Sequence, residues 1–481
     1  MKAAVIGSGP NGLSAAIVLA QAGMDVEVFE AQPTPGGGAR SMELTLPGFQ
    51  HDFGSAVHPL GIGSPFFASL GLERYGLEWL HSPAALAHPL DDGTASILYQ
   101  DLSTTAAALG RDGDAWCSLM EPFSTRWTDL TEDILGPPIH FPRHPFLLAR
   151  FGRDAILPAT TVARTHFTGE PARALFAGIA AHSFLALDSP LSASFGMVLA
   201  IAGHAVGWPI PRGGAQAIAD ALAACLRDLG GTIHVNSPID RLSDIAEADV
   251  ILCDITPRQL LAISDGGAAF TPAYRRQLQA YRYGPGVFKV DYALSSPIPW
   301  TAPTCASAAT VHLGGTLEEI AASESAIAQG RTARRPFVLL SQPTLFDPTR
   351  APVGKHIAWA YCHVPNGCTE DMLPRLEAQI ERFAPGFSAT ILARHVSTPA
   401  ILEALNPNLI GGDISGGAIT LRQFILRPTP GEYRTSAPNV YLCSSSTPPG
   451  GGVHGMCGFH AARTAIRDLA RKKSESRLTQ P

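Results

Sequence analysis

The sequence predicts an α/β fold in which a parallel-sheet domain is assembled from separated segments and interrupted by an α+β domain. Three observations support this. A strand, a glycine-rich turn, a helix and a second strand open the chain at residues 2–30. A further β–α–β pattern spans residues 207–254, and a strand, a glycine-rich loop and a helix close the chain at 437–472. Strands that alternate with helices are typical of parallel sheets.

The composition limits the possible functions. The chain has 481 residues, of which 46% are apolar and 16% charged, with a net charge of −6. This length favours two or three domains. No basic stripe is present, so nucleic acid is not expected as a partner. The first residues already read as a strand, and no apolar run is long enough to span a bilayer. The eight cysteines form no CxxC pair, so we expect reduced thiols and a cytoplasmic location.

The first element pair carries a dinucleotide-binding pattern. After the apolar strand "AAVIG", Gly7, Gly9 and Gly12 form GxGxxG before a helical pattern, and the next strand "DVEVFE" ends at Glu30. Gly7 permits a tight turn, Gly9 admits a pyrophosphate, and Gly12 lets helix and strand pack closely. The helix N-terminus favours an anion. Glu30 can accept hydrogen bonds from an adenosine ribose and would repel a 2′-phosphate, so NADP is not expected here.

The next segment, "AQPTPGGGARSMEL", distinguishes between dinucleotides. It holds a turn at 36–38 followed by Arg40 and Ser41. This resembles the second glycine motif of the flavin amine oxidase and carotenoid desaturase superfamily, which lies against the pyrophosphate and ribityl chain of FAD. The resemblance implies that Arg40 contacts a phosphate, as its fork of donors allows; the alternative is a surface arginine. No second GxGxxG follows a strand, so a pyridine-nucleotide–disulfide reductase is not expected.

The middle of the chain returns to the nucleotide-binding sheet. "PRGGAQAIADALAACLRDLGG" predicts a loop and an amphipathic helix, "TIHVNSPIDRL" a strand and turn, and "ADVILCDITP" a strand ending near Asp254. The same superfamily has a similar segment, and the resemblance implies that Ile239 touches the adenine. We therefore assign 1–75, 205–290 and 411–481 to an FAD-binding domain. Residues 76–204 and 291–410 are assigned to a substrate-binding or cap domain.

Two residues are candidates for catalysis. Lys289 lies in an alternating strand within "YGPGVFKVDYALSSPIPW". In the amine oxidase branch a lysine in a similar strand holds a water at flavin N5, and the alternative is the polar side of an ordinary strand. His58, in "GSAVHP", and also His454, could act as an acid or base, or be structural.

Two apolar stretches have no nucleotide motif. Residues 177–208 are apolar but interrupted by Asp188 and Pro190, which predicts a buried helix pair rather than a membrane span. In residues 141–167, phenylalanine, leucine and arginine alternate. This stretch could line a lipophilic channel or contact a membrane, and the alternative is ordinary core with solvated arginines.

The C-terminal segment, "APNVYLCSSSTPPGGGVHGMCGFHAARTAIRDLARK", predicts a strand, a loop of small residues and a helix. It resembles the C-terminal motif of the phytoene desaturase-like FAD oxidoreductases, as do "TPAILEALNPNLIGGDISGG" and "RPTPGEY". We expect the helix to begin near Val453 and to direct N–H groups at the flavin. The chain departs from many relatives at residues 444–446, where three serines leave no acid for the ribityl hydroxyls.

The resemblance implies an FAD-dependent oxidoreductase. We expect it to desaturate an apolar, carotenoid- or isoprenoid-like or other lipophilic substrate by hydride transfer to flavin N5, with oxygen or a quinone-like compound as electron acceptor. An amine or amino-acid oxidase on the same fold and a non-catalytic flavin-binding protein stay open. An NAD-dependent dehydrogenase would leave the second and C-terminal motifs without a role. No metal site is predicted. The expected cofactor-binding residues are Gly7, Ser8, Gly9, Pro10, Asn11, Gly12, Glu30, Ala31, Gly37, Gly38, Ala39, Arg40, Ser41, Ser55, Ala56, Ile239, Ser445, Gly452, Val453, His454 and Met456.

Overall fold

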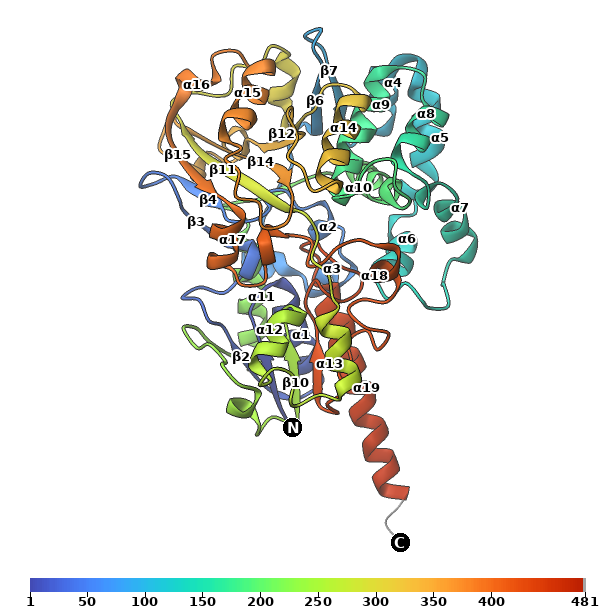
Figure 1. Cartoon of the computed structure of the whole chain (residues 1–481), viewed down its shortest axis with the longest axis vertical. Helices are drawn as coiled ribbons and strands as arrows, with labels where there is room; N and C mark the ends of the chain where they lie inside the picture. The colour runs from blue at the N-terminus through green and yellow to red at the C-terminus, as the bar shows by residue number, and fades with distance from the viewer. Residues whose placement is uncertain (479–481) are drawn as a thin grey trace.

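The computed structural model describes residues 1–478 and has two halves, one above the other in Figure 1. The lower half is built on a five-stranded parallel sheet of order β16-β10-β1-β2-β9. Its strands come from both ends and the middle of the chain. They are β1 (Lys2–Ile6), β2 (Asp25–Phe29), β9 (Thr232–His234), β10 (Val250–Cys253) and β16 (Val440–Leu442).

Alternate residues of β1 show why this sheet is covered on both faces. Ala3 and Val5 belong to the core shared with α1 (Pro10–Gln21), α11 (Gln216–Asp228) and α19 (Met456–Leu478). Ala4 and Ile6 belong to the opposite core, formed with α12 (Pro257–Ile263) and α13 (Pro272–Gln279). Parallel sheets need helices on both faces, and their strands are therefore apolar throughout.

The upper half contains a seven-stranded mixed sheet of order β15-β11-β14-β13-β12-β6-β7, in which only β12 and β6 pair in parallel. Its strands are β6 (Ala84–Pro89), β7 (Ala95–Leu98), β11 (Gly286–Leu294), β12 (Ala308–Leu313), β13 (Val338–Ser341), β14 (His356–Val364) and β15 (Ile391–Ser397). The boundary that we placed at residue 290 falls inside β11. Because the whole of β11 pairs in this sheet, its first residue, Gly286, already belongs to the upper half.

Helices lie on both faces of this sheet. α15 (Leu373–Phe383) shares a core with Phe288 and Val290, whereas α14 (Leu317–Ala328) shares another core with Val287 and Tyr361. Further helices extend to the side of the sheet (Figure 1). The predicted buried helix pair is confirmed as α9 (Glu170–Ala180) and α10 (Ser192–Ala205), whose inner residues lie in the largest core. The other helices of this half are α4 (Leu102–Leu109), α5 (Gly113–Ser124), α6 (Trp127–Ile134), α7 (Pro145–Ala155), α8 (Ala159–His166), α14 (Leu317–Ala328), α15 (Leu373–Phe383) and α16 (Phe387–Thr390).

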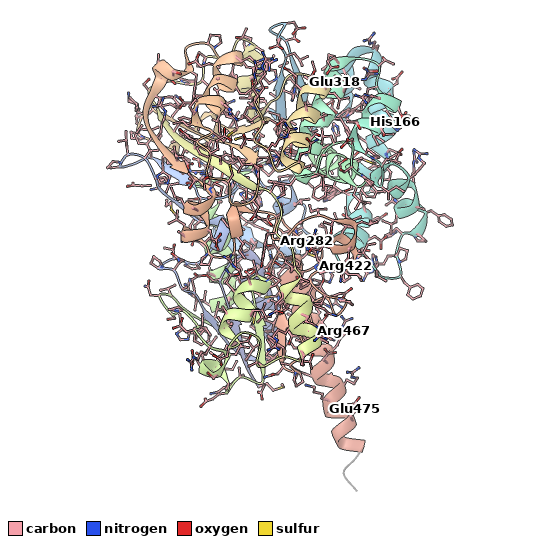
Figure 2. All side chains as sticks on the ribbon, in the orientation of Figure 1. His166, Arg282, Glu318, Arg422, Arg467 and Glu475 are labelled. Carbon is pink, nitrogen blue, oxygen red and sulfur yellow. The ribbon has the colours of Figure 1, made fainter. Side chains whose placement is uncertain are left out.

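Short elements join the halves. Arg282 and Arg422 mark this waist in Figure 2. The short elements are α2 (Pro59–Ile62), α3 (Pro65–Leu70), α17 (Pro399–Leu405), α18 (Leu421–Ile425), β3 (Ser41–Glu43), β4 (Gln50–Asp52), β5 (Trp79–Leu80) and β8 (Ile210–Pro211). Within residues 1–478, no helix is both long enough and apolar enough to cross a membrane. All eight cysteines are free, and six of them are buried.

Candidate functional site

The first glycine turn lies at the carboxyl end of β1 and leads into α1. Gly7 has a φ of +90° and donates its N–H to the Phe29 carbonyl oxygen at 2.8 Å. A Cβ added at Gly12 would overlap the carbonyl oxygen of Gly7, and one added at Gly9 would lie 2.6 Å from Asp254 Oδ2. Pro10 is the first residue of α1, where its missing N–H is no loss. The turn therefore has the geometry that the GxGxxG spacing predicts.

Glu30 follows β2 directly and lies beside this turn. The residue is 7% exposed, and its carboxylate accepts hydrogen bonds from Ser8 N at 3.0 Å, Ser8 Oγ at 2.6 Å and Gln32 N at 2.9 Å. Ala31 continues the chain from Glu30, and Ile239 is half-buried against the core next to β10. The acid thus stands at the sheet edge where a ribose would meet it, although its oxygens are bonded to the protein here.

Asp254 is a residue whose role the sequence analysis missed. It follows β10, and its Oδ2 accepts a hydrogen bond from Gly12 N at 2.9 Å. Burial raises the pKa of this carboxyl to about 7, and the charge of Glu30 adds to the shift. A carboxyl group therefore occupies the N-terminal end of α1, which favours anions. The sequence does contain a signal for this contact. An acid that directly follows a strand of a parallel sheet lies at the same sheet edge as the glycine turn.

The second glycine motif packs against the first. Gly37, Gly38 and Ala39 form one short 3₁₀ turn, and a Cβ added at Gly37 would lie 3.1 Å from Gly9 Cα. The two motifs, separated by a helix and a strand in the sequence, are thus in backbone contact. This close approach is what small residues permit.

Arg40 is not a surface arginine, since it is 4% exposed. Its Nε donates to the Gly37 carbonyl oxygen at 2.9 Å, and Nη2 donates to the Leu405 carbonyl oxygen at 2.9 Å. Nη1 donates to Gln32 Oε1 at 3.2 Å, and the guanidinium lies 5.0 Å from the Phe53 ring centre. Each of its three nitrogen atoms already has a protein acceptor, so Arg40 ties the second glycine motif to the C-terminal end of α17.

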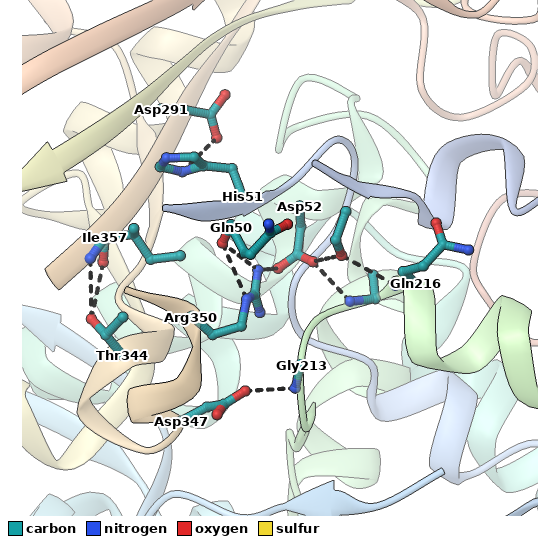
Figure 3. A network of polar contacts seen from close by, with 12 residues as sticks. Gln50, His51, Asp52, Gly213, Gln216, Asp291, Thr344, Asp347, Arg350 and Ile357 are labelled. Atoms are coloured by element: carbon teal, nitrogen blue, oxygen red, sulfur yellow. Dashed lines mark hydrogen bonds and ion pairs between the residues drawn. The ribbon is translucent and has the colours of Figure 1, made fainter. Parts of the chain in front are cut away.

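Ser41 belongs to a buried network that joins the two halves (Figure 3). Its Oγ donates to Asp52 Oδ1 at 2.7 Å, and the same oxygen accepts from Ala215 N at 2.7 Å. Asp52 Oδ2 pairs with Arg350 Nη2 at 2.9 Å, and both side chains are buried. The charge of Arg350 and these hydrogen bonds lower the pKa of Asp52 against the opposing effect of burial. This network fixes the start of α11 against the β3–β4 hairpin.

Lys289 is buried in the upper half, at the edge of the same network. Its Nζ forms an ion pair with Asp291 Oδ2 and lies 5.8 Å from the Trp359 ring centre. Asp291 Oδ1 lies 3.6 Å from His51 Nδ1 (Figure 3). Burial, with the charges of Lys289 and Arg350, lowers the pKa of His51 to about 3, so His51 is neutral. Lys289 therefore does not face water, and its charge is balanced by an acid two residues away.

The sheet face that carries Lys289 is aromatic and polar. Lys289 pairs with Tyr361 and Asp291 with Trp359 in the β11–β14 ladder, and directly opposed residues share a face. The rings of Trp359 and Tyr361 stack at 5.5 Å. Further along, His363 Nδ1 bonds to Glu324 Oε2 at 2.7 Å. This interior surface is therefore less apolar than a purely lipophilic pocket.

His58 is buried, and burial lowers its pKa to about 4. Its backbone N–H donates to the Pro209 carbonyl oxygen at 3.0 Å. Its Nε2 has no hydrogen-bond partner among the described residues, as is also true of Asn11 Oδ1 beside the first glycine turn. Ser55 and the buried Ala56 lie on the segment that leads to it. A neutral His58 cannot supply a permanent charge at neutral pH.

The expected start of the last helix is corrected. α19 begins at Met456 rather than Val453, because Gly455 has a φ of +70° and breaks the helical path. The N–H of Met456 is bonded to His454 Nδ1 at 3.1 Å, so it is not free to meet a ligand. Burial lowers the pKa of His454 to about 4. Gly452 and Val453 precede this turn as exposed and half-buried loop residues.

The serine-rich loop after β16 is fixed by backbone contacts. Ser446 Oγ donates to the Gly416 carbonyl oxygen at 2.8 Å. A Cβ added at Gly416 would overlap Ser445 Oγ, so residues 444–446 lie directly on the loop around Gly416. The buried Asn11 Oδ1, which has no protein partner beside the first glycine turn, fits a polar dinucleotide at this edge of the sheet.

Comparisons with known proteins agree with this geometry. A family model described as an NAD(P)-binding Rossmann-like domain matches residues 5–68. The pyridine nucleotide-disulfide oxidoreductase domain-containing protein 2 of Rattus norvegicus is 28% identical, over 97% of this chain and 93% of that protein. Phytoene dehydrogenase of Streptomyces griseus is 26% identical, over 93% of this chain and 91% of that protein.

Solved structures show the fold. An oxidoreductase from Methanosarcina mazei is 17% identical with a TM-score of 0.64, over 97% of this chain and all of that chain. A putrescine oxidase triple mutant is 17% identical with a TM-score of 0.61, over 98% of this chain and 99% of that chain. The predicted fold class is thus confirmed: a Rossmann-like domain with a mixed α/β partner, as in flavin amine oxidase-like oxidoreductases. The relatives are named as oxidoreductases, dehydrogenases or desaturases and support an oxidoreductase, and they leave its substrate open.

Proposed function

We propose that this chain is an FAD-dependent oxidoreductase that dehydrogenates an organic substrate held between its two halves. The observation that carries the proposal is the backbone contact between the two glycine motifs beside Glu30. A Cβ at Gly37 would lie 3.1 Å from Gly9 Cα. The second glycine motif would have no role in an NAD-dependent dehydrogenase. In an FAD enzyme, the same motif would lie along the pyrophosphate and ribityl chain of the cofactor.

The chain's residues would divide the work as follows. The turn from Gly7 to Gly12 and the N-terminus of α1 would bind the pyrophosphate. Glu30 would exchange its bonds to Ser8 for bonds to the ribose hydroxyls. When bound, FAD would supply the hydride-accepting ring. The loop at 444–453 would lie beside that ring, and His58 would border it as a neutral, buried side chain.

For the substrate, we favour desaturation of a carbon–carbon bond in a lipophilic compound. Two relatives named for phytoene support this: the Streptomyces protein and the neurosporene-forming phytoene desaturase of Rhodobacter capsulatus, which is 24% identical over 95% of this chain. The rat relative's name refers to an oxidoreductase class. The second GxGxxG of this sequence, at residues 450–455, is separated from β16 by a loop and so does not form the strand–turn unit of that class.

Amine oxidation is the second candidate. It is favoured by Lys289, which lies on a strand beside the stacked rings of Trp359 and Tyr361. The polar character of this sheet face suits a substrate with hydrogen-bonding groups. The ion pair between Lys289 and Asp291 argues against amine oxidation, because the lysine is already engaged with an acid.

The test begins with the visible spectrum of the purified protein and identification of the released cofactor. We expect a yellow protein that releases FAD. Anaerobic mixing with carotenoid precursors should then bleach the flavin band, whereas an amine oxidase would instead release peroxide from amines in air. A colourless protein that takes up no added FAD would contradict the proposal. A flavin that binds but is reduced by no candidate substrate would favour the non-catalytic alternative.

A further inference from the structure

Arg427 is a buried cation next to the glycine-rich C-terminal loop. It follows α18 and is 4% exposed. Its Nη2 donates to Tyr281 Oη at 3.2 Å and to the Ser415 carbonyl oxygen at 3.4 Å. A Cβ added at Gly450 would lie 3.1 Å from its Nη1. The guanidinium thus lies against the first glycine of residues 450–452.

No acid neutralises this cation by direct contact. Among the side chains that the structure describes, Arg427 bonds to the Tyr281 hydroxyl and the Ser415 carbonyl oxygen but to no carboxylate, and its Nε has no hydrogen-bond partner. The acid that interacts with it at longer range is Asp413, which is fully buried. Asp413 already accepts hydrogen bonds from Gly284 N and Ser415 N, each at 2.7 Å.

Burying a charge without a bonded counter-ion costs desolvation free energy, so a bound anion beside Arg427 would be stabilising. Arg40, the other buried arginine near the glycine motifs, has acceptors for all three of its nitrogens. Arg427 instead keeps an unpartnered N–H in a region that the proposed function assigns to the flavin. Two-electron reduction adds negative charge to the flavin ring, and a fixed cation in a low-dielectric site stabilises such charge strongly.

We propose that Arg427 is a cofactor-binding residue whose guanidinium stabilises the negative charge of bound FAD, above all in its reduced form. This inference rests on the proposed function. It predicts that Arg427 strengthens FAD binding and raises the reduction potential of the flavin. Tyr281 is then a positioning residue, because its hydroxyl accepts from Arg427 and donates to the Gly416 carbonyl oxygen at 2.7 Å.

The experiment compares four variants of the full chain. Arg427→Met removes the charge and keeps the bulk, while Arg427→Lys keeps the charge. Tyr281→Phe removes only the positioning hydroxyl. Arg422→Met is the matched control, because Arg422 is an exposed arginine five residues away at the waist of the molecule (Figure 2). The measurements are the FAD dissociation constant of the apoprotein, the flavin midpoint potential, and the melting temperature of the apoprotein.

We expect Arg427→Met to weaken FAD binding at least tenfold and to lower the potential by about 30 mV or more, which is a tenfold change in the reduction equilibrium. Arg427→Lys should recover most of the potential, Tyr281→Phe should have a smaller effect, and Arg422→Met none. The apoprotein of Arg427→Met should melt no lower than wild type, because an uncompensated charge has been removed.

Wild-type affinity and potential in Arg427→Met, with a lower melting temperature, would overturn the inference and assign Arg427 to structure alone. If Arg427→Met does not fold, the flavin midpoint potentials of Arg427→Lys and Arg427→Gln are compared instead. Equal potentials in these two variants would overturn the inference. Failure of the wild type to bind FAD would instead overturn the proposed function, so the two failures are distinguishable.

Discussion

At the residue scale, Gly12 has no room for a side chain. A Cβ there would overlap the Gly7 carbonyl oxygen, whereas a Cβ at Gly38 would meet no atom of the protein within 4 Å. We expect Gly12→Ala to destabilise the fold by about 1–3 kcal/mol through overpacking and to abolish FAD binding. Gly38→Ala is the control and should fold as wild type. Urea denaturation and FAD titration measure both effects, and equal stability of the two variants would refute the packing role of Gly12.

Asp254 gives a pH-dependent prediction. Its pKa is raised to about 7 in the folded protein, so between its ordinary pKa and 7 the folded state binds more protons than the unfolded state. The carboxyl therefore favours folding at low pH, and this contribution is lost as pH rises through 7, by up to about 4 kcal/mol. Asp254→Asn keeps an acceptor for Gly12 N but has no charge to bury.

The melting temperature of Asp254→Asn should accordingly exceed that of wild type at pH 8 and approach it near pH 4. Asp254→Leu, which loses the acceptor, separates the hydrogen bond from the charge. A constant difference between Asp254→Asn and wild type at all pH values would show that the carboxyl does not titrate in this range.

At the scale of elements, the loop after α6 and the first turn of α7 together have an unusual surface. Phe141 and Phe146 are 99% and 90% exposed, and Ile139 is 66% exposed. The inner side of α7 packs in the core. The apolar stretch predicted at residues 141–167 is therefore ordinary core on its inner side, whereas its outer side exposes apolar side chains. The exposed Arg150 lies on the same helix. Aromatic tips with nearby arginines suit the headgroup region of a bilayer.

We expect the protein to co-sediment with vesicles that contain phosphatidylglycerol. Phe141→Ser with Phe146→Ser should reduce the bound fraction at least tenfold, because each phenyl group withdrawn from water contributes about 1.5–3 kcal/mol. Val353→Ser is the control, since Val353 is fully exposed on a different loop. Equal sedimentation of the double variant and the control would rule out insertion of this segment.

Some elements could be predicted because their pattern is local. The strand–turn–helix start, the helix pair at α9 and α10, and the strand around Lys289 each follow from apolar spacing and glycines. The start of α19 could not, because it depends on a left-handed Gly455 and on the side chain of His454 bonding to Met456 N. Likewise, the ion pair of Lys289 with Asp291 and the position of Arg427 beside Gly450 arise from contacts that only the folded chain creates.

At the scale of the whole molecule, buried histidines dominate the acid response. Burial lowers the pKa of His58, His88, His204, His454 and His460 to about 4 and that of His182 to about 3. They lie in both halves, so protonation would affect the entire fold. Asp254, Asp291 and Asp413 act in the opposite direction, because burial raises their pKa values. His51, whose pKa burial lowers to about 3, adds to the effect of the six histidines.

These histidines predict acid unfolding well above the pH at which ordinary carboxylates protonate. Their pKa values in the unfolded chain are near 6.5, so between pH 6.5 and 4 the unfolded state binds more protons. Stability is therefore full above pH 6.5 and falls as pH drops, by up to about 1.4 kcal/mol per histidine and pH unit. The melting temperature should decline steeply below pH 6. His460→Gln, which replaces a ring bonded to the Leu135 carbonyl oxygen, should flatten this decline relative to His234→Gln, a control at a half-exposed histidine. A melting temperature that stays level from pH 7 to pH 4.5 would mean that these rings take up protons without unfolding the chain.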